Sequence, residues 1–345
     1  MLTAMWHELE LRKDYLANQV VESIYFGGGT PSVLSAAELG KFIDAVAHLH
    51  AVSPQAEITV EANPDDLSAE KVYQLRQTPV NRFSIGIQSF FDEDLKWMNR
   101  AHTAMEADSA VKRVQDAGFD NITLDLIYGF PLLSDEKWRS NILKVLDLQV
   151  PHVSAYSMTV EERTALAHFI RKGTQPAMND AQSARQFLFL TESLVNHGFE
   201  HYEISNFALP GKYSFHNTNY WKGVSYLGIG PSAHSFNGTS RQWNVANNAK
   251  YISAILKDQV PAESETLCAT DRLNEYIMTS LRTMWGMDLN KIEKDFGMNY
   301  RLSVENGLHE FKEKKWIENK EGIVVLSAQG KLFADHIASQ LFVGD

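Results

Sequence analysis

The segment Ile24-Tyr25-Phe26-Gly27-Gly28-Gly29-Thr30-Pro31-Ser32 sets a pattern that the N-terminal half of this 345-residue chain repeats. An apolar run typical of a β-strand, residues 23–26, stops at three consecutive glycines, and an amphipathic helix is expected from about residue 36. A glycine run between a strand and a helix leaves main-chain N–H and C=O groups accessible to a ligand, because no Cβ shields them. An ordinary tight turn between strand and helix has the same pattern. The rest of the chain decides between these two interpretations.

Short apolar runs and amphipathic helices alternate as far as about residue 208. A first helix is expected over residues 2–20, and strands are expected over residues 23–26, 56–64, 82–90, 121–128, 152–158 and 201–207. Such alternation predicts an α/β fold with a parallel sheet and right-handed crossovers. Periodicity alone leaves open whether the sheet is flat and doubly wound or curled into a (β/α) barrel.

Polar side chains recur late in successive predicted strands. Glu61 follows the apolar residues 58–60, Gln88 follows residues 84–87, and Asp125 comes late in the run 121–128. Each of these alone is more typical of a solvated strand end. Because functional groups of a (β/α) barrel gather at the carboxyl ends of its strands, the series together with the glycine loop predicts a shared site.

Composition excludes several classes of protein. The net charge of −11 argues against a nucleic-acid or anionic-membrane partner, because both require a basic surface. No apolar run approaches the roughly 18 residues of a membrane span, and no signal peptide is visible, so a cytoplasmic protein is expected. The one cysteine, Cys268, excludes a disulfide framework or a cysteine-ligated metal cluster built from these residues alone.

The segment 270–345 does not continue the alternation of strands and helices. It is predicted to have several helices, then a short hairpin over residues 316–326 and a final helix over 328–341. Three helices and a β-wing resemble a winged helix, a fold that often binds DNA. Ten Lys and Arg residues stand against twelve Asp and Glu in this segment, so the basic footprint of a DNA-binding domain is missing. A packing or lid domain is the preferred interpretation.

Several motifs resemble the radical S-adenosylmethionine (SAM) enzymes related to oxygen-independent coproporphyrinogen III oxidase. They are Tyr25-Phe-Gly-Gly-Gly-Thr-Pro-Ser32, Val60-Glu-Ala-Asn-Pro64, Phe83-Ser-Ile-Gly-Ile-Gln-Ser-Phe90 and Asp125-Leu-Ile-Tyr-Gly-Phe-Pro131. Three more are similar to the HemW branch of haem chaperones: Tyr202-Glu-Ile-Ser-Asn-Phe-Ala208, His216-Asn-Thr-Asn-Tyr-Trp221 and Gly228-Ile-Gly-Pro-Ser-Ala-His-Ser235. The resemblance implies a partial (β/α)₆ barrel over residues 1–208, a linking segment 209–269, and a small helical C-terminal domain 270–345.

The resemblance also implies which residues contact SAM. Gly28, Gly29 and Thr30 would hold its methionine end through exposed backbone, and Glu61 would accept hydrogen bonds from the ribose hydroxyls. Gln88 and Arg100 would address the polar and carboxylate groups, and Asp125 would complete the ring of strand-end groups. Without the family, Arg100 would be assigned to a surface salt bridge.

The motif His216-Asn-Thr-Asn-Tyr-Trp221 is the second candidate site. An imidazole can ligate haem iron, and Tyr220 and Trp221 could cover a porphyrin face. The alternative is a histidine hydrogen-bonded within a loop beside aromatic residues. With the resemblance, we expect haem near His216 and a protein that passes haem to acceptor proteins. Coproporphyrinogen III oxidase, which oxidatively decarboxylates propionate groups, is the alternative function.

One feature departs from the family. Its members carry a Cys-x₃-Cys-x₂-Cys loop after the first barrel strand, whose thiolates hold three irons of a [4Fe–4S] cluster and leave the fourth for SAM. This sequence has no cysteine before Cys268 and begins on a predicted helix. We therefore expect that the cluster-binding segment and the first barrel strand are missing by truncation and that the intact form carries the cluster; the alternative is a true cluster-free homologue. As given, this polypeptide is expected to bind no cluster and to be inactive as a radical enzyme.

Overall fold

The computed structural model describes residues 1–344, which form two compact units. The first unit comprises Met1–Ile24, Ala37–Ala56 and the chain from Phe215 onward. The second comprises Tyr25–Ala36 and Glu57–Ser214 and carries the glycine loop together with the expected strand-end residues. None of the helices in the described part of the chain is both long enough and apolar enough to cross a membrane.

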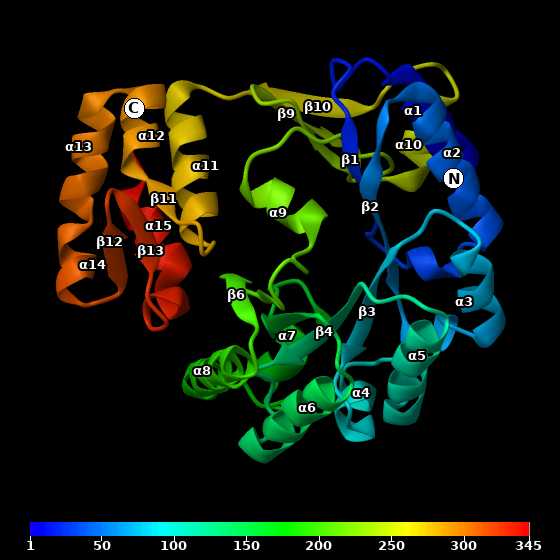
Figure 1. Ribbon diagram of the computed structural model, residues 1–345, viewed down its shortest axis with the longest axis horizontal. Coiled ribbons are helices and arrows are strands. Elements are labelled where there is room, and N and C mark those ends of the chain that lie inside the picture. Colours follow the sequence, from blue (N-terminus) through cyan, green and yellow to red (C-terminus); the bar gives the residue numbers. More distant parts are fainter. Residues whose placement is uncertain (345) are drawn as a thin grey trace. The chain divides into compact units, whose positions relative to one another are not determined.

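A seven-stranded sheet in the order β1-β2-β3-β4-β5-β7-β6 underlies the glycine loop (Figure 1). Its first five strands are β1 (Val21–Phe26), β2 (Val52–Ala62), β3 (Arg82–Gln88), β4 (Ile122–Tyr128) and β5 (His152–Ser157). The pairs β2–β3, β3–β4 and β4–β5 are parallel, in the register Val60 to Phe83, Phe83 to Ile122 and Thr123 to His152. The predicted α/β fold with a parallel sheet is therefore confirmed.

Helices connect these strands, and all of them except α7 lie at positions that the sequence predicts. They are α2 (Ala36–Leu49), α3 (Ala69–Arg76), α4 (Asp92–Trp97), α5 (Ala104–Asp116), α6 (Asp135–Asp147), α7 (Ala165–Arg171) and α8 (Asp180–Asn196). Ser68 caps α3 by accepting a hydrogen bond from the Lys71 N–H at 3.2 Å, as expected for a helix N-cap. Figure 1 shows α5, α6 and α8 on one side of the strands, where they bury residues such as Val111 and Leu190. The parallel strands are thus covered by amphipathic helices, as burial of their apolar residues requires.

The sixth predicted strand, residues 201–207, is wrong as a single element. The chain forms two short antiparallel strands instead, β6 (Glu200–Glu203) and β7 (Asn206–Ala208), and β7 pairs antiparallel with β5. The buried Glu203 carboxylate turns the chain, because it accepts hydrogen bonds from the Ser205 N–H at 3.0 Å and the Asn206 side chain at 2.6 Å. The hydrogen bonds of this buried carboxylate thus stabilise a hairpin where one strand was predicted.

The N-terminal helix is shorter than predicted. Helix α1 (Leu2–Leu11) ends well before residue 20, and left-handed backbone at Ala17 and Asn18 follows it. Its Glu8 carboxylate is fully buried and accepts hydrogen bonds from the Gly230 N–H at 2.8 Å and the Tyr251 hydroxyl at 2.5 Å. Asn244 donates a further bond at 2.7 Å, and Arg12 on the same helix pairs with Glu8 at 3.3 Å.

The Glu8 cluster ties α1 to elements that the sequence leaves unassigned. These are α10 (Asn248–Ile255) and a three-stranded sheet of β8 (His234–Phe236), β9 (Ser240–Asn244) and β10 (Ala262–Thr266). The sequence also leaves α9 (Phe215–Trp221) unassigned. The buried Tyr251 and Ile255 of α10 pack against Ala4 of α1. The motif of residues 228–235 is therefore used to anchor the N-terminal helix.

The C-terminal segment has the predicted helices and wing. Helices α11 (Ala269–Leu281), α12 (Leu289–Phe296), α13 (Met298–Gly307), α14 (His309–Glu313) and α15 (Ala334–Leu341) surround a small sheet. Its strands are β11 (Met287–Asp288), β12 (Ile317–Lys320) and β13 (Ile323–Leu326), in the order β11-β13-β12. Gly322 has φ +89° in the β12–β13 turn, a conformation that favours glycine.

Candidate functional site

The three glycines form an open loop after β1. Gly28 and Gly29 have φ +70° and +94°, and no atom lies within 4 Å of the position that a Cβ would occupy at either residue. Gly27 differs, because a Cβ there would lie 2.5 Å from Tyr25 Cε1 and 2.9 Å from Glu61 Oε1. The loop therefore has two residues of accessible backbone and one that is closely covered by the Glu61 carboxylate.

Glu61, the next-to-last residue of β2, is held against this loop. Its Oε1 accepts a hydrogen bond from the Tyr25 hydroxyl at 2.6 Å, and its Oε2 accepts one from the Gly28 N–H at 3.2 Å. Burial and the adjacent carboxylate raise the pKa of Tyr25 far above its ordinary value, so the phenol remains a donor. The carboxylate is fixed in position and retains lone pairs for further donors.

The loop is braced from its far side. Thr30 is half-buried and precedes a short 3₁₀ helix, Pro31–Val33. The Ser32 hydroxyl donates to Asp66 Oδ2 at 2.6 Å and accepts from the Asn63 N–H at 3.2 Å. The segments after β1 and after β2 are therefore joined through one buried hydroxyl.

Asp125 lies at the middle of β4, not at its end as the sequence suggests. The Ser84 hydroxyl on β3 is 3.0 and 3.2 Å from its two carboxylate oxygens. Desolvation raises the pKa of Asp125 to about 7, and the negative charge of Glu61 adds to this, while the Ser84 hydrogen bond opposes it. Near neutral pH this side chain can therefore act as a proton donor or as an acceptor.

Gln88 and Arg100 meet over Gly86. A Cβ at Gly86 would lie 2.9 Å from Gln88 Nε2 and 3.3 Å from Arg100 Nη2. Gln88 has φ +65° at an irregularity in the pairing of β3 with β4, an unusual backbone conformation for a residue other than glycine. Arg100 Nη2 donates to Asn63 Oδ1 at 2.6 Å, so this hydrogen bond orients the guanidinium.

The structure brings all seven predicted SAM contacts into the second unit. The hydrogen bond from the Gly28 N–H to Glu61 joins the glycine loop to β2. The hydrogen bond from Arg100 to Asn63 joins Arg100 to the turn after β2. Tyr25, Asn63 and Ser84 were missed by the sequence analysis. Tyr25 precedes the glycines and Asn63 lies in the Glu-Ala-Asn-Pro motif, so adjacency to a motif was the signal that could have identified them.

His216 lies in the first unit, near the start of α9. Its Nδ1 is 3.0 Å from the Ser23 Oγ of β1, and its ring is 5.5 Å from that of Tyr220. Burial lowers the pKa of His216 to about 4, so the imidazole is neutral at physiological pH. A neutral imidazole with one nitrogen held by a hydrogen bond is the form in which histidine binds metals.

The C-terminal end of α9 is held by cation–π contacts. The Arg282 guanidinium lies 5.2 Å from the centre of the Trp221 ring, and Lys222 Nζ lies 4.5 Å from that of Trp285. Helix α9 is thus attached to β1 at one end and to the segment after α11 at the other.

Comparison with known proteins identifies the family. Residues 6–144 match the model of the radical SAM superfamily, and residues 267–333 match the HemN C-terminal domain. The chain is 33% identical to the heme chaperone HemW of Lactococcus lactis, over 94% of this chain and 86% of that protein. It is 34% identical to HemW of Bacillus subtilis, over 92% of this chain and 84% of that protein. The chain belongs to the HemW family.

A solved structure supports the fold of this HemW-family chain. Escherichia coli coproporphyrinogen III oxidase, HemN, a radical SAM enzyme, aligns with a TM-score of 0.82 over 99% of this chain and 82% of its own. The sequence identity is 21%, so this likeness concerns the fold. It confirms the predicted partial barrel and decides against a flat doubly wound sheet.

The residues present do not fit an iron–sulfur cluster. Cys268 is exposed at the N-cap of α11, where its Sγ accepts a hydrogen bond from the Asp271 N–H at 3.4 Å. A [4Fe–4S] cluster of a radical SAM protein requires thiolates close together. Within residues 1–344, no group of three or more His, Cys, Asp or Glu is arranged to hold a metal ion. No chemical step through a cluster can therefore be derived from these side chains.

Proposed function

We propose that this protein is a haem chaperone that binds SAM in its barrel and haem near helix α9, and that it delivers haem to acceptor proteins in the cytoplasm. Family membership supports the proposal, because relatives at 31–34% identity that match over more than 90% of this chain are named heme chaperones. Residues 267–333 match the HemN C-terminal domain, and basic residues are not in excess over acidic ones in the segment 270–345.

The strand-end residues fit SAM by their donor and acceptor types. The open backbone at Gly28, Gly29 and Thr30 suits the amino and carboxylate groups of the methionine end. The Glu61 carboxylate suits two ribose hydroxyls, because it has two acceptor oxygens. The cradle at Gly27 supports this assignment, since any side chain there would displace the carboxylate.

Three further side chains complete the proposed SAM site. Arg100, oriented by Asn63, suits the SAM carboxylate, and Gln88 lies beside it. Asp125, on β4, is the last of the proposed SAM contacts. With a pKa of about 7, it can donate or accept a hydrogen bond.

The state of His216 is the single observation that carries the haem assignment. The imidazole is neutral because burial lowers its pKa, and the Ser23 hydroxyl holds Nδ1 at 3.0 Å. A neutral imidazole is the form that can bind haem iron through a ring nitrogen. Tyr220, 44% exposed beside the histidine, offers an aromatic surface to the porphyrin ring.

A haem titration tests this function. Absorbance spectra of the purified chain with increasing haem should show a shifted Soret band, and His216→Ala should lose the shift. His309→Ala is the matched control, because His309 is an exposed histidine at the start of α14. An unchanged spectrum with His216→Ala would remove the assignment of this histidine.

Oxygen-independent coproporphyrinogen III oxidase is the second candidate, favoured by the structural likeness to HemN. The two functions differ in ligand, because a haem chaperone recognises an iron-bearing ring and the oxidase an iron-free porphyrinogen. Competition between the two ligands distinguishes them. The chaperone predicts that coproporphyrinogen III fails to displace bound haem, whereas ready displacement would favour the oxidase.

A further inference from the structure

A large hollow lies in the second unit beyond the carboxyl end of β5. It is lined by the end of β5, the loop that follows, one side of α7 and the loop that leads into α8, with a cavity volume of about 940 Å³. This volume is within the range of pockets that bind cofactor-sized ligands. None of the seven proposed SAM contacts lines it.

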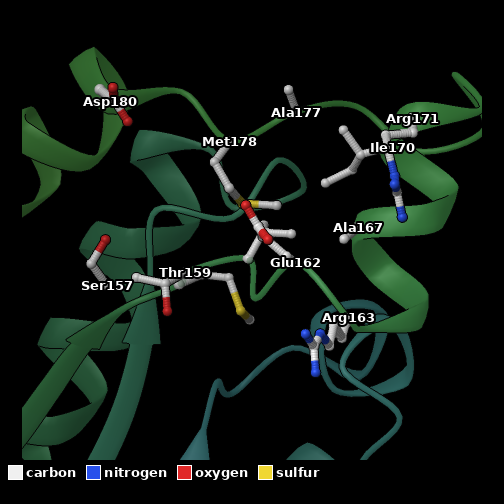
Figure 2. Close-up of a pocket in the computed structure, with 12 residues that line it drawn as sticks. Ser157, Thr159, Glu162, Arg163, Ala167, Ile170, Arg171, Ala177, Met178 and Asp180 are labelled. Atoms are coloured by element: carbon white, nitrogen blue, oxygen red, sulfur yellow. The ribbon is translucent and has the colours of Figure 1, made fainter.

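Six of the twelve residues that line this hollow are apolar. In Figure 2, Ile170 extends from α7 and Met178 extends from the loop before α8, both toward the centre. Val160 and Ala167 add to the apolar lining. Aliphatic and thioether groups suit a flat apolar ligand, because a methionine side chain adapts its shape to the surface that it contacts.

Two arginines line the hollow. Figure 2 shows Arg171 at the end of α7 and Arg163 just before this helix begins, while Asp180 lies away from both. Both guanidiniums are exposed, and within the part of the chain that the structure describes neither has a hydrogen-bond or ion-pair partner. Arg100 and Arg82, by contrast, are held by protein acceptors.

The two arginines therefore place unpaired guanidinium groups beside apolar side chains. A guanidinium prefers a carboxylate in bidentate geometry. Glu162 also lines the hollow, next to Arg163 in the chain, and its negative charge would repel a carboxylate. Removing that charge therefore tests whether the ligand carries carboxylates. The complementary ligand is flat and apolar, with carboxylates along one edge.

We propose that this hollow binds a tetrapyrrole, with its ring against Ile170 and Met178 and its propionate carboxylates on Arg163 and Arg171. The ligand class rests on the proposed haem function, but the hollow recognises the ring edge and not the iron. His216 is not among the residues that line the hollow. Ser157, which ends β5, borders it, so the tetrapyrrole lies at the same end of the parallel strands as Glu61 and Gln88.

Iron-free protoporphyrin IX tests the hollow independently of His216, because a ring without iron has no use for an imidazole ligand. Its fluorescence on titration with the full chain should report saturable binding. The double variant Arg163→Gln/Arg171→Gln should weaken this binding about tenfold or more, since two charge-assisted hydrogen-bond pairs are lost. Glu162→Gln should tighten it, because a repelling carboxylate is removed.

Two controls make the test specific. Arg185→Gln removes an exposed arginine on α8 that pairs with Asp135 outside the hollow, and it should leave the affinity unchanged. The dimethyl ester of protoporphyrin IX should bind the parent chain as weakly as the double variant binds the free acid, because its carboxylates are blocked.

The outcomes separate this proposal from the haem function. If the double variant changes the affinity for protoporphyrin by less than about twofold, the proposal that the hollow binds a tetrapyrrole is wrong. This holds even if His216→Ala abolishes the haem spectrum. If instead the double variant weakens protoporphyrin binding while His216→Ala leaves the haem spectrum intact, the hollow stands and the histidine assignment fails. Equal binding of the dimethyl ester and the free acid also overturns recognition of the carboxylates.

Discussion

Asp125→Asn should stabilise this protein in a pH-dependent way. Desolvation on β4 raises the pKa of Asp125 from 3.8 to about 7 in the folded chain. Between about pH 4 and pH 7 the unfolded chain releases this proton while the folded chain keeps it. The unfolded state then binds fewer protons, so the free energy of unfolding falls as the pH rises.

The size of the effect follows from the shift. One pKa unit corresponds to about 1.4 kcal/mol, so a shift of about three units corresponds to about 4 kcal/mol above pH 7. Asparagine does not titrate and can still accept a hydrogen bond from Ser84. Asp125→Asn therefore removes the fall in the free energy of unfolding that Asp125 causes as the pH rises. The difference in unfolding free energy between Asp125→Asn and the parent should therefore increase by about 1.4 kcal/mol per pH unit up to pH 7.

Urea unfolding followed by circular dichroism, from about pH 4.5 to pH 8.5, measures this difference. Asp116→Asn is the control, because it removes an exposed carboxylate at the end of α5 and should change the profile little. Parallel profiles for Asp125→Asn and the parent would refute the reasoning, since they would mean that Asp125 ionises in the folded chain as it does in the unfolded one.

Two further substitutions test the contacts around the glycine loop and helix α1. Gly27→Ala should weaken SAM binding about tenfold or more in calorimetric titration, because its Cβ would lie 2.5 Å from Tyr25 and 2.9 Å from Glu61; unchanged affinity would contradict the proposed cradle. Glu8→Ala should lower the free energy of unfolding by about 3–5 kcal/mol, because it leaves buried donors without their acceptor. Glu10→Ala on the exposed side of the same helix should cost less than about 0.5 kcal/mol, and equal losses for the two variants would argue against the buried cluster.

Local sequence patterns accounted for much of the barrel. The strands β1 to β5 and the helices α2 to α6 and α8 were predicted because their apolar periodicity and caps are local properties of the chain. The hairpin of β6 and β7 was not, because the turn depends on hydrogen bonds that the buried Glu203 makes. Helices α7 and α9 were missed because each has only seven residues, and so short a segment gives little helical periodicity to detect.

The sequence by itself determined the alternation of strands and helices, the open glycine backbone and the set of polar residues near the strand ends. It also identified the family, because each motif is a short run of residues and the order of the motifs can be read along the chain. Tertiary structure alone decided the state of those residues. Tyr25 fixes Glu61, desolvation shifts Asp125, and Ser23 meets His216 across 193 positions of the chain. Charge states and hydrogen-bond partners depend on burial and on residues distant in sequence, and no local pattern records either.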